Sequence, residues 1–254
     1  MNEIHTMPTT WRQVNSMVED LIKTLNGPTD SFWEEKLIHA NVYQISKNNQ
    51  AIGFFSVFQK ETITSFYLIP EAWSDAQEIF QLAIKHEFVQ EALVATCDEA
   101  FLSHSLDVGK KVERQAYFFE TLRINESKGP FSLEVAMESD QSFIQEKSGE
   151  FFDDLEQQIC RQEIYLGKVG DEIVGFGVME LGVIRKEMAS IGMYVCEEYR
   201  RKGFGTRIIQ ELQRRTIDKN RIPIAGCWVW NHGSKKTLER AGLISQTRYM
   251  KISF

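Results

Sequence analysis

The sequence predicts a mixed α/β protein built as two similar halves in tandem. Segments with strand composition alternate with segments of helical apolar spacing, which favours sheets flanked by helices. Short motifs of residues 43–117 return in the same order in residues 165–249. The stretch RINESKGP, residues 123–130, is rich in turn formers and separates the halves. We expect domains over 1–125 and 126–254, each with a mixed, mostly antiparallel sheet.

Four ordered matches relate the halves, and their separations grow slowly along the chain. The first match joins the hairpin patterns YQISKNNQAIGFF and YLGKVGDEIVGFG. The separations are 122, 127, 132 and 132 positions, for Tyr43 with Tyr165, Glu71 with Glu198, Leu106 with Leu238 and Tyr117 with Tyr249. Small loop insertions produce such a drift, so duplication explains the pattern better than chance similarity does.

The elements of each half follow one order: a helix, a strand hairpin, a further strand, a helix, a strand, a short helix and a last strand. Polar turns join the hairpin strands, Asn48-Asn49 in the first half and Gly170-Asp171 in the second. In the second half we expect strands at 131–137, 163–169, 172–181, 187–195, 223–230 and 247–253, and helices at 141–159, 205–219 and 234–242.

A charged, glycine-containing loop joins the strand ending at Val195 to the next helix. Phe204, Ile208 and Leu212 are spaced for one helical face, so the helix begins inside the glycine pair. A helix N-terminus offers free N–H groups and a positive dipole end, glycine allows close backbone approach, and Arg and Lys add charged donors. The loop therefore predicts a pyrophosphate site, formed by Arg200, Arg201, Lys202, Gly203, Phe204, Gly205 and Thr206.

The charge distribution also points to a small polyanionic ligand. The net charge is -7, yet residues 198–254 contain 13 Lys and Arg against 4 Asp and Glu. An extended nucleic-acid surface needs a wider spread of basic charge, so no nucleic-acid partner is expected. Ordinary solvated helix faces remain an alternative explanation for this basic region.

Several protein classes are not expected. The sequence has no run of about 18 apolar residues and no secretion signal at its start. The four cysteines are scattered without a CxxC pair, which argues against zinc, any other metal site or a disulfide framework. We expect a cytoplasmic protein without membrane partners, either a monomer or a homodimer.

Two spaced motifs resemble the GNAT acetyltransferase superfamily. Arg200-x-x-Gly203-x-Gly205 is similar to its Q/R-x-x-G-x-G/A loop, and Asn231-x-x-Ser234 is similar to its N-x-x-S segment. The resemblance covers most of residues 130–254 and implies acetyl-coenzyme A as the cofactor. It implies that the pantetheine arm pairs with the backbone of Met193, Tyr194 and Val195, that the pyrophosphate contacts the N–H groups of 201–206, and that Asn231 and Ser234 line the cofactor.

The two halves together resemble tandem GNAT proteins with a degenerate first half. The loop after Trp73 reads SDAQEIF, with no glycine and with Asp75 and Glu78. Like charge there repels a pyrophosphate, so we expect no coenzyme binding in the first half and a contribution to the acceptor pocket instead.

The catalytic groups are less well defined by the resemblance. Many family members place a tyrosine seven residues after the motif asparagine, where this chain has Leu238. Ser234 and Tyr249 are the substitute candidates for the acid that protonates the leaving thiolate. Glu180 and Glu198 are candidates for the base that deprotonates the amine, and a water chain is an open alternative.

The resemblance implies an acetyl-coenzyme A-dependent N-acetyltransferase. The expected acceptor is the primary amine of a small molecule, attacking directly in a ternary complex. The alternatives are a non-catalytic acetyl-coenzyme A-binding protein and an enzyme that acetylates a protein or peptide.

Overall fold

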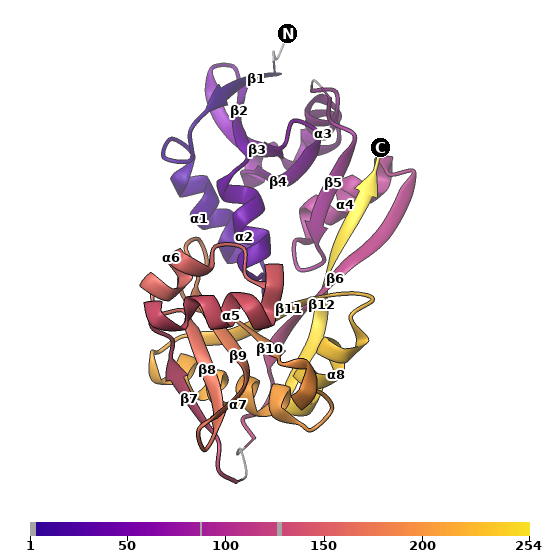
Figure 1. The fold of residues 1–254 in the computed structure, drawn as a ribbon. Helices are drawn as coiled ribbons and strands as arrows, with labels where there is room; N and C mark the ends of the chain where they lie inside the picture. The colour runs from indigo at the N-terminus through magenta and orange to yellow at the C-terminus, as the bar shows by residue number, and fades with distance from the viewer. Residues whose placement is uncertain (1–3, 87, 126–128) are drawn as a thin grey trace. The chain divides into compact units, whose positions relative to one another are not determined.

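The computed structural model describes residues 4–86, 88–125 and 129–254, which form two compact units (Figure 1). Unit 1 comprises residues up to Tyr117 together with Thr247–Phe254, and unit 2 comprises Phe118–Gln246. Each contains a mixed sheet with flanking helices, which confirms the predicted fold class. The expected boundary and linker fall partly on residues 126–128, which lie outside the described residues.

Unit 1 is a mixed sheet with the strand order β1-β2-β3-β4-β5-β12. All pairs with a described register are antiparallel except β4 with β5, which run parallel. Its strands are β1 (Ile4–Thr9), β2 (Asn41–Lys47), β3 (Gln50–Phe58), β4 (Thr62–Leu68), β5 (Glu91–Ala95) and the end of β12 (Leu243–Ser253). Its helices are α1 (Asn15–Thr24), α2 (Ser31–Ile38), α3 (Ala76–Ile84) and α4 (Glu99–Val108).

Two adjacent phenylalanines on β3 contribute to a core on each face of the sheet of unit 1. Phe54 contacts Trp11, whereas its neighbour Phe55 stacks on Tyr43 on the other face. Successive side chains of a strand point to opposite faces, so two adjacent buried phenylalanines serve two layers. Phe80 on α3 and Phe101 on α4 pack into the core that contains Phe55.

Unit 2 repeats this plan with the strand order β6-β11-β10-β9-β8-β7. Here β10 runs parallel to β11 and antiparallel to β9. The strands are β6 (Lys111–Thr121), which begins in unit 1, β7 (Ser132–Val135), β8 (Ile164–Val169), β9 (Glu172–Leu181), β10 (Met188–Val195) and β11 (Ile222–Trp228). The helices are α5 (Gln141–Ser148), α6 (Leu155–Cys160), α7 (Phe204–Asp218) and α8 (His232–Ala241).

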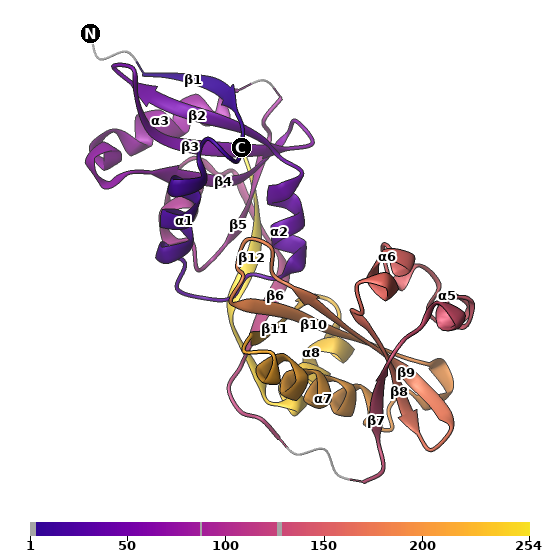
Figure 2. The ribbon, with the colours of Figure 1, turned by 90° about the vertical axis from the view of Figure 1, so that its left-hand side faces the viewer.

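The helices of unit 2 lie on both faces of its sheet, as Figure 2 shows for α7 and for α5 with α6. Helix α7 packs closely because β9 has glycines beneath it. A Cβ built on Gly175 or Gly177 meets side-chain atoms of Ile208 at 3.1 Å. The single helix expected over 141–159 is instead two helices, because Gly149 adopts φ 58 and ends α5.

The described part of the chain, 4–86, 88–125 and 129–254, holds no helix that is both long and apolar enough to span a bilayer.

Candidate functional site

The parallel strands β10 and β11 pair at one end only. Their register covers Met188 with Ile222, Ala189 with Pro223 and Ser190 with Ile224. Strand β10 nevertheless continues to Val195, and it stays paired with β9 along that length. In the described register, the edge of β10 beyond Ser190 therefore lacks a β11 partner, and the two strands form a wedge-shaped opening.

The hydrogen-bond pattern shows which backbone groups face this opening. The Ile222 N–H donates to the Glu187 carbonyl, whereas the Cys196 N–H donates to the carbonyl of Val174, a residue of β9. Backbone groups alternate sides along a strand, so the odd-numbered residues of β10 face β11. Met193 and Val195 consequently direct their N–H groups into the opening. The Tyr194 backbone faces β9, so of the three residues expected to pair with pantetheine only Met193 and Val195 are placed to do so.

The first turn of α7 lies beside the end of β10. Its N-cap, Gly203, adopts φ 88, and no side chain caps the turn. The turn contains no acidic residue, in contrast to the α3 turn of unit 1, which contains Glu78. Arg201 also has a positive φ of 63. Uncapped N–H groups at a helix start, without nearby acid in the turn, suit an anion.

Gly205 brings the second motif to the same place. A Cβ at this position meets Thr237 Cγ2 of α8 at 3.1 Å and Val195 Cγ2 at 3.3 Å. The absence of a side chain thus lets α7, α8 and the end of β10 converge. Asn231 caps α8, since its Oδ1 accepts a hydrogen bond from the Ser234 N–H at 3.0 Å. Both motifs therefore border one region of unit 2.

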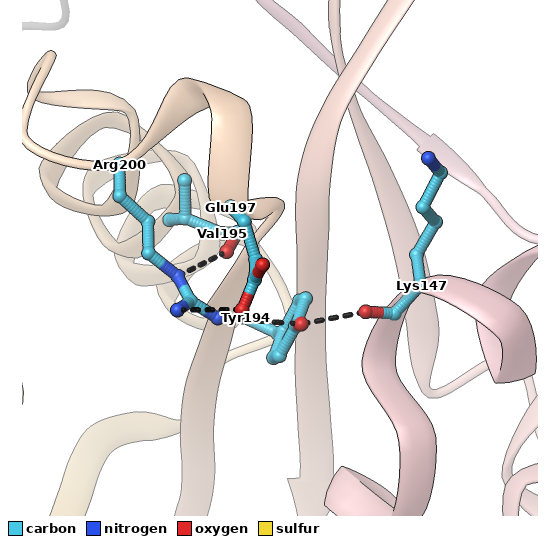
Figure 3. Close-up of polar contacts among 5 residues, drawn as sticks. All are labelled: Lys147, Tyr194, Val195, Glu197 and Arg200. Carbon is cyan, nitrogen blue, oxygen red and sulfur yellow. Dashed lines mark hydrogen bonds and ion pairs between the residues drawn. The ribbon is translucent and has the colours of Figure 1, made fainter.

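Arg200 holds the end of β10 through three contacts of its guanidinium (Figure 3). Its Nε donates to the Val195 carbonyl at 3.1 Å, Nη2 donates to the Tyr194 hydroxyl at 3.3 Å, and Nη1 pairs with Glu197 at 3.3 Å. The Val195 carbonyl thus accepts a hydrogen bond from a side chain of its own unit. Arg200 positions the strand end, whereas Arg201 and Lys202 are exposed beside the helix start.

Tyr194 anchors the opposite face of the sheet to α5. Its hydroxyl donates to the Lys147 carbonyl at 2.5 Å (Figure 3). Its ring stacks on Phe176 and contacts Phe151. Lys147 in turn places its Nζ 3.6 Å from Glu198. Sequence reasoning did not identify Lys147, because a lysine on an amphipathic helix carries no signal of its tertiary partner.

Glu180 lies where the opening begins. It is the cross-strand partner of Ser190, the last β10 residue paired with β11. Directly paired residues of a sheet point to the same face, which here is the face of α6, because Gln158 Nε2 of α6 donates to Glu180 Oε1 at 2.9 Å. A half-buried carboxylate at this point can accept a proton from a group that enters from the α6 face.

The other proposed base, Glu198, is in a different environment. It is exposed, and hydrogen bonding to its own backbone N–H together with Lys147 lowers the pKa of its carboxyl. A lower pKa makes a carboxylate a weaker proton acceptor at neutral pH. Of the two candidates, Glu180 has the position better suited to general-base work.

The two acid candidates, Ser234 and Tyr249, lie in different environments. Ser234 is half-buried in the first turn of α8, whereas Leu238, at the usual tyrosine position, is buried in the core. Tyr249 belongs to unit 1, where it pairs with Ala95 of β5 and is completely buried. Burial raises its pKa and holds the phenol neutral, so we do not carry Tyr249 forward as a catalytic residue.

Two tryptophans lie at the end of β11 and just after it. The Trp228 and Trp230 rings are stacked, with centroids 5.5 Å apart and an interplanar angle of 4°. Both are substantially exposed. Among the residues that the structure describes, no group of three or more His, Cys, Asp or Glu side chains is arranged to hold a metal ion.

Family models match each half of the sequence. One, described as an acetyltransferase (GNAT) domain, matches residues 10–122, and another, described as the acetyltransferase (GNAT) family, matches residues 133–243. A comparison with curated proteins finds no match.

Solved structures match nearly the whole chain. An acetyltransferase from the GNAT family of Colwellia psychrerythraea has a TM-score of 0.89 at 19% identity, covering 99% of both chains. A GCN5-related N-acetyltransferase from Sphaerobacter thermophilus has a TM-score of 0.69 at 13% identity, covering 99% of this chain and 95% of that one. A tandem GNAT protein from the clavulanic acid biosynthesis pathway, determined without AcCoA, has a TM-score of 0.62 at 10% identity, covering 99% and 98%. At these identities the likeness concerns the fold.

Proposed function

The chain belongs to the GNAT acetyltransferase family, with two such domains in tandem, and from this premise we propose that unit 2 transfers an acetyl group from acetyl-coenzyme A to the primary amine of a small molecule. The amine attacks the thioester directly, with both substrates bound. The observation that carries the proposal is the opening between β10 and β11, which lies beside an uncapped helix start.

The residues around the opening fit two parts of this cofactor, the pantetheine arm and the pyrophosphate. Pantetheine contains amide groups, and the N–H groups of Met193 and Val195 offer strand-like hydrogen bonds to them. The pyrophosphate fits the first turn of α7, where Gly203 lets the chain enter the helix at positive φ and Lys202 is exposed nearby. Asn231 and Ser234 border the same region from α8.

When bound, acetyl-coenzyme A supplies a thioester carbonyl that accepts the amine nucleophile. The backbone N–H of Val195, directed into the opening, is placed to stabilise negative charge that develops on the carbonyl oxygen. Glu180 accepts the proton that an ordinary ammonium must lose before it can attack. An alkyl thiol has a pKa of about 8.5 and its thiolate leaves readily, so the reaction does not require a tyrosine at position 238.

Unit 1 lacks the features that would hold the same cofactor. The first turn of α3 contains Glu78, and the preceding Asp75 forms an ion pair with Lys47. The segment directly before this helix, residues 69–75, contains no glycine. We therefore assign acetyl-coenzyme A to unit 2 alone.

A second candidate function is acetyl-coenzyme A binding without catalysis. The observation that favours it is Leu238, a buried leucine at the position where many relatives have the acidic tyrosine. A protein or peptide acceptor is the further alternative, and an amine panel that includes a peptide separates these possibilities.

The test combines turnover with cofactor binding. Free thiol release is followed with acetyl-coenzyme A and a panel of small amines and one lysine peptide. Coenzyme A affinity is measured by calorimetry for wild type, Lys202→Glu and the control Lys219→Glu, which changes the same charge at the other end of α7. We expect Lys202→Glu to weaken binding on the order of 10-fold and Lys219→Glu to leave it within about 2-fold.

The binding and turnover results test the cofactor site and the catalytic activity separately. Equal binding by the two variants would show that the pyrophosphate is not at the start of α7. Tight binding without turnover on any amine would favour the non-catalytic alternative.

A further inference from the structure

Unit 1 contains a cavity of about 430 Å³ at the end of β4. It lies between the first turns of α3 and α4 and is closed on another side by residues of α1. Strands β4 and β5 pair only at Thr62 with Glu91 and Ile63 with Ala92 in the described register. The cavity therefore occupies the place in unit 1 that the opening between β10 and β11 occupies in unit 2.

Two residues at equivalent positions show how the chemistry of this place differs between the units. In unit 2, Arg200 Nε donates to the Val195 carbonyl, five residues earlier, at 3.1 Å. In unit 1, Trp73 Nε1 donates to the Leu68 carbonyl, also five residues earlier and also at 3.1 Å. The contact is preserved, but an indole ring replaces the guanidinium cation and lines the cavity.

The residues that cap α8 and α4 also differ in charge. Asn231 caps α8 by accepting from the Ser234 N–H, and Asp98 caps α4 by accepting from the Phe101 N–H at 3.2 Å. Asp98 is 7% exposed and lines the cavity, next to Glu99. Within residues 4–86, 88–125 and 129–254, no salt bridge joins Asp98 to a lysine or arginine, and no lining residue of the cavity is basic at neutral pH. A neutral amide in unit 2 thus corresponds to an acid in unit 1.

Besides aliphatic and hydroxyl side chains, the cavity lining contains an imidazole and aromatic rings. His104 Nδ1 is buried and has no hydrogen-bond partner within the described part of the structure. Burial lowers the pKa of this imidazole, which keeps it neutral and able to accept a hydrogen bond. Phe66 and Tyr67 add ring surface beside Trp73. Carboxylate, neutral imidazole and aromatic faces together are the groups that attract organic ammonium ions.

We propose that this cavity of unit 1 binds a small organic ammonium ion with an apolar body, held by Asp98 and His104 and covered by Trp73. A volume of this size accommodates a small molecule, and the lack of basic lining groups disfavours an anionic one. Unit 1 thus has an opening at the same place in its sheet as unit 2. Its lining favours a cation, whereas the opening of unit 2 favours an anion. The assignment does not depend on the reaction that unit 2 catalyses.

The test uses the full chain without acetyl-coenzyme A at pH 8, where Asp98 is ionised although burial raises the pKa of its carboxyl to about 7. Calorimetry measures binding of 2-phenylethylamine, benzylamine and tryptamine, and of 3-phenylpropionate as an anion of similar shape. The variants are Asp98→Asn, which retains a capping side chain, and Trp73→Arg, which installs the unit 2 residue. The matched control is Asp30→Asn, because Asp30 is also a buried N-cap of unit 1, accepting from the Trp33 N–H at 3.0 Å, but does not line the cavity.

We expect at least one amine to bind wild type and the Asp30→Asn variant with similar affinity, and 3-phenylpropionate to bind neither. Asp98→Asn and Trp73→Arg should each weaken amine binding about 10-fold or more, as expected when a charged hydrogen-bond partner is removed or a like charge is added. Unchanged coenzyme A binding and circular dichroism establish that the variants are folded. The proposal would be overturned if Asp98→Asn bound the amines as tightly as Asp30→Asn. It would also be overturned if 3-phenylpropionate bound more tightly than the amines, or if no amine bound at concentrations on the order of 10 mM.

Discussion

Replacing Asp98 with asparagine is expected to make the protein more stable at pH 8 while changing it little at low pH. Burial raises the pKa of Asp98 from an ordinary value of 3.8 to about 7, and its hydrogen bond from the Phe101 N–H offsets only part of this shift. The folded protein therefore keeps a proton between about pH 4 and 7 that the unfolded chain has released. Stability consequently declines as the pH rises through this window, and the loss is complete above the folded pKa.

The size of the effect follows from the two pKa values. A difference of about 3 units corresponds to about 4 kcal/mol, at roughly 1.4 kcal/mol per unit. About 2.5 kcal/mol of this loss falls between pH 5 and pH 8, because part of it has already occurred by pH 5. Asparagine has no proton to lose and is as good an N-cap as aspartate, as Asn231 shows in unit 2.

The assay is urea unfolding of wild type and Asp98→Asn at pH 5 and pH 8, followed by circular dichroism. The other titratable groups that line the cavity are Glu99 and His104 on α4 and Tyr67 on β4. The lowered pKa of His104 acts with the opposite sign, since stability from this group increases with pH, but both proteins contain it. The free energy of unfolding of the variant, relative to that of wild type, should increase by about 2.5 kcal/mol from pH 5 to pH 8. Parallel pH profiles for the two proteins would refute the reasoning.

Two further predictions concern unit 2. Glu180→Gln should lower kcat on the order of 100-fold without changing coenzyme A affinity, because general bases contribute about that much; a kcat within about 2-fold of wild type would remove Glu180 from the mechanism. Gly203→Ala should destabilise unit 2 by about 1–2 kcal/mol in urea unfolding, because φ 88 strains an L-residue although the added Cβ meets nothing within 4 Å. Gly203→Asn should cost less, since asparagine tolerates the left-handed region, and equal costs for the two variants would contradict the strain argument.

Much of the site was predictable because it depends on local sequence. Glycine at positive φ and basic residues before a helix act within a few residues, so Gly203 and Lys202 could be singled out from the loop sequence, whereas Asn231 was reached through the family resemblance. The acid candidate Tyr249 could not be judged in this way. Its burial depends on β5 of unit 1, more than 150 positions earlier in the chain.

The sequence by itself determined the two-unit plan, the order of strands and helices, and the loop suited to an anion, because these follow from periodicity, turn formers and the conformational freedom of glycine. Tertiary structure alone decided where β10 leaves β11, which of its N–H groups face the opening, and how Arg200 and Trp73 make the same contact in the two units. These features depend on strand register and on side chains that meet across elements. No local pattern of residues encodes such meetings, because their energies arise only when distant segments pack together.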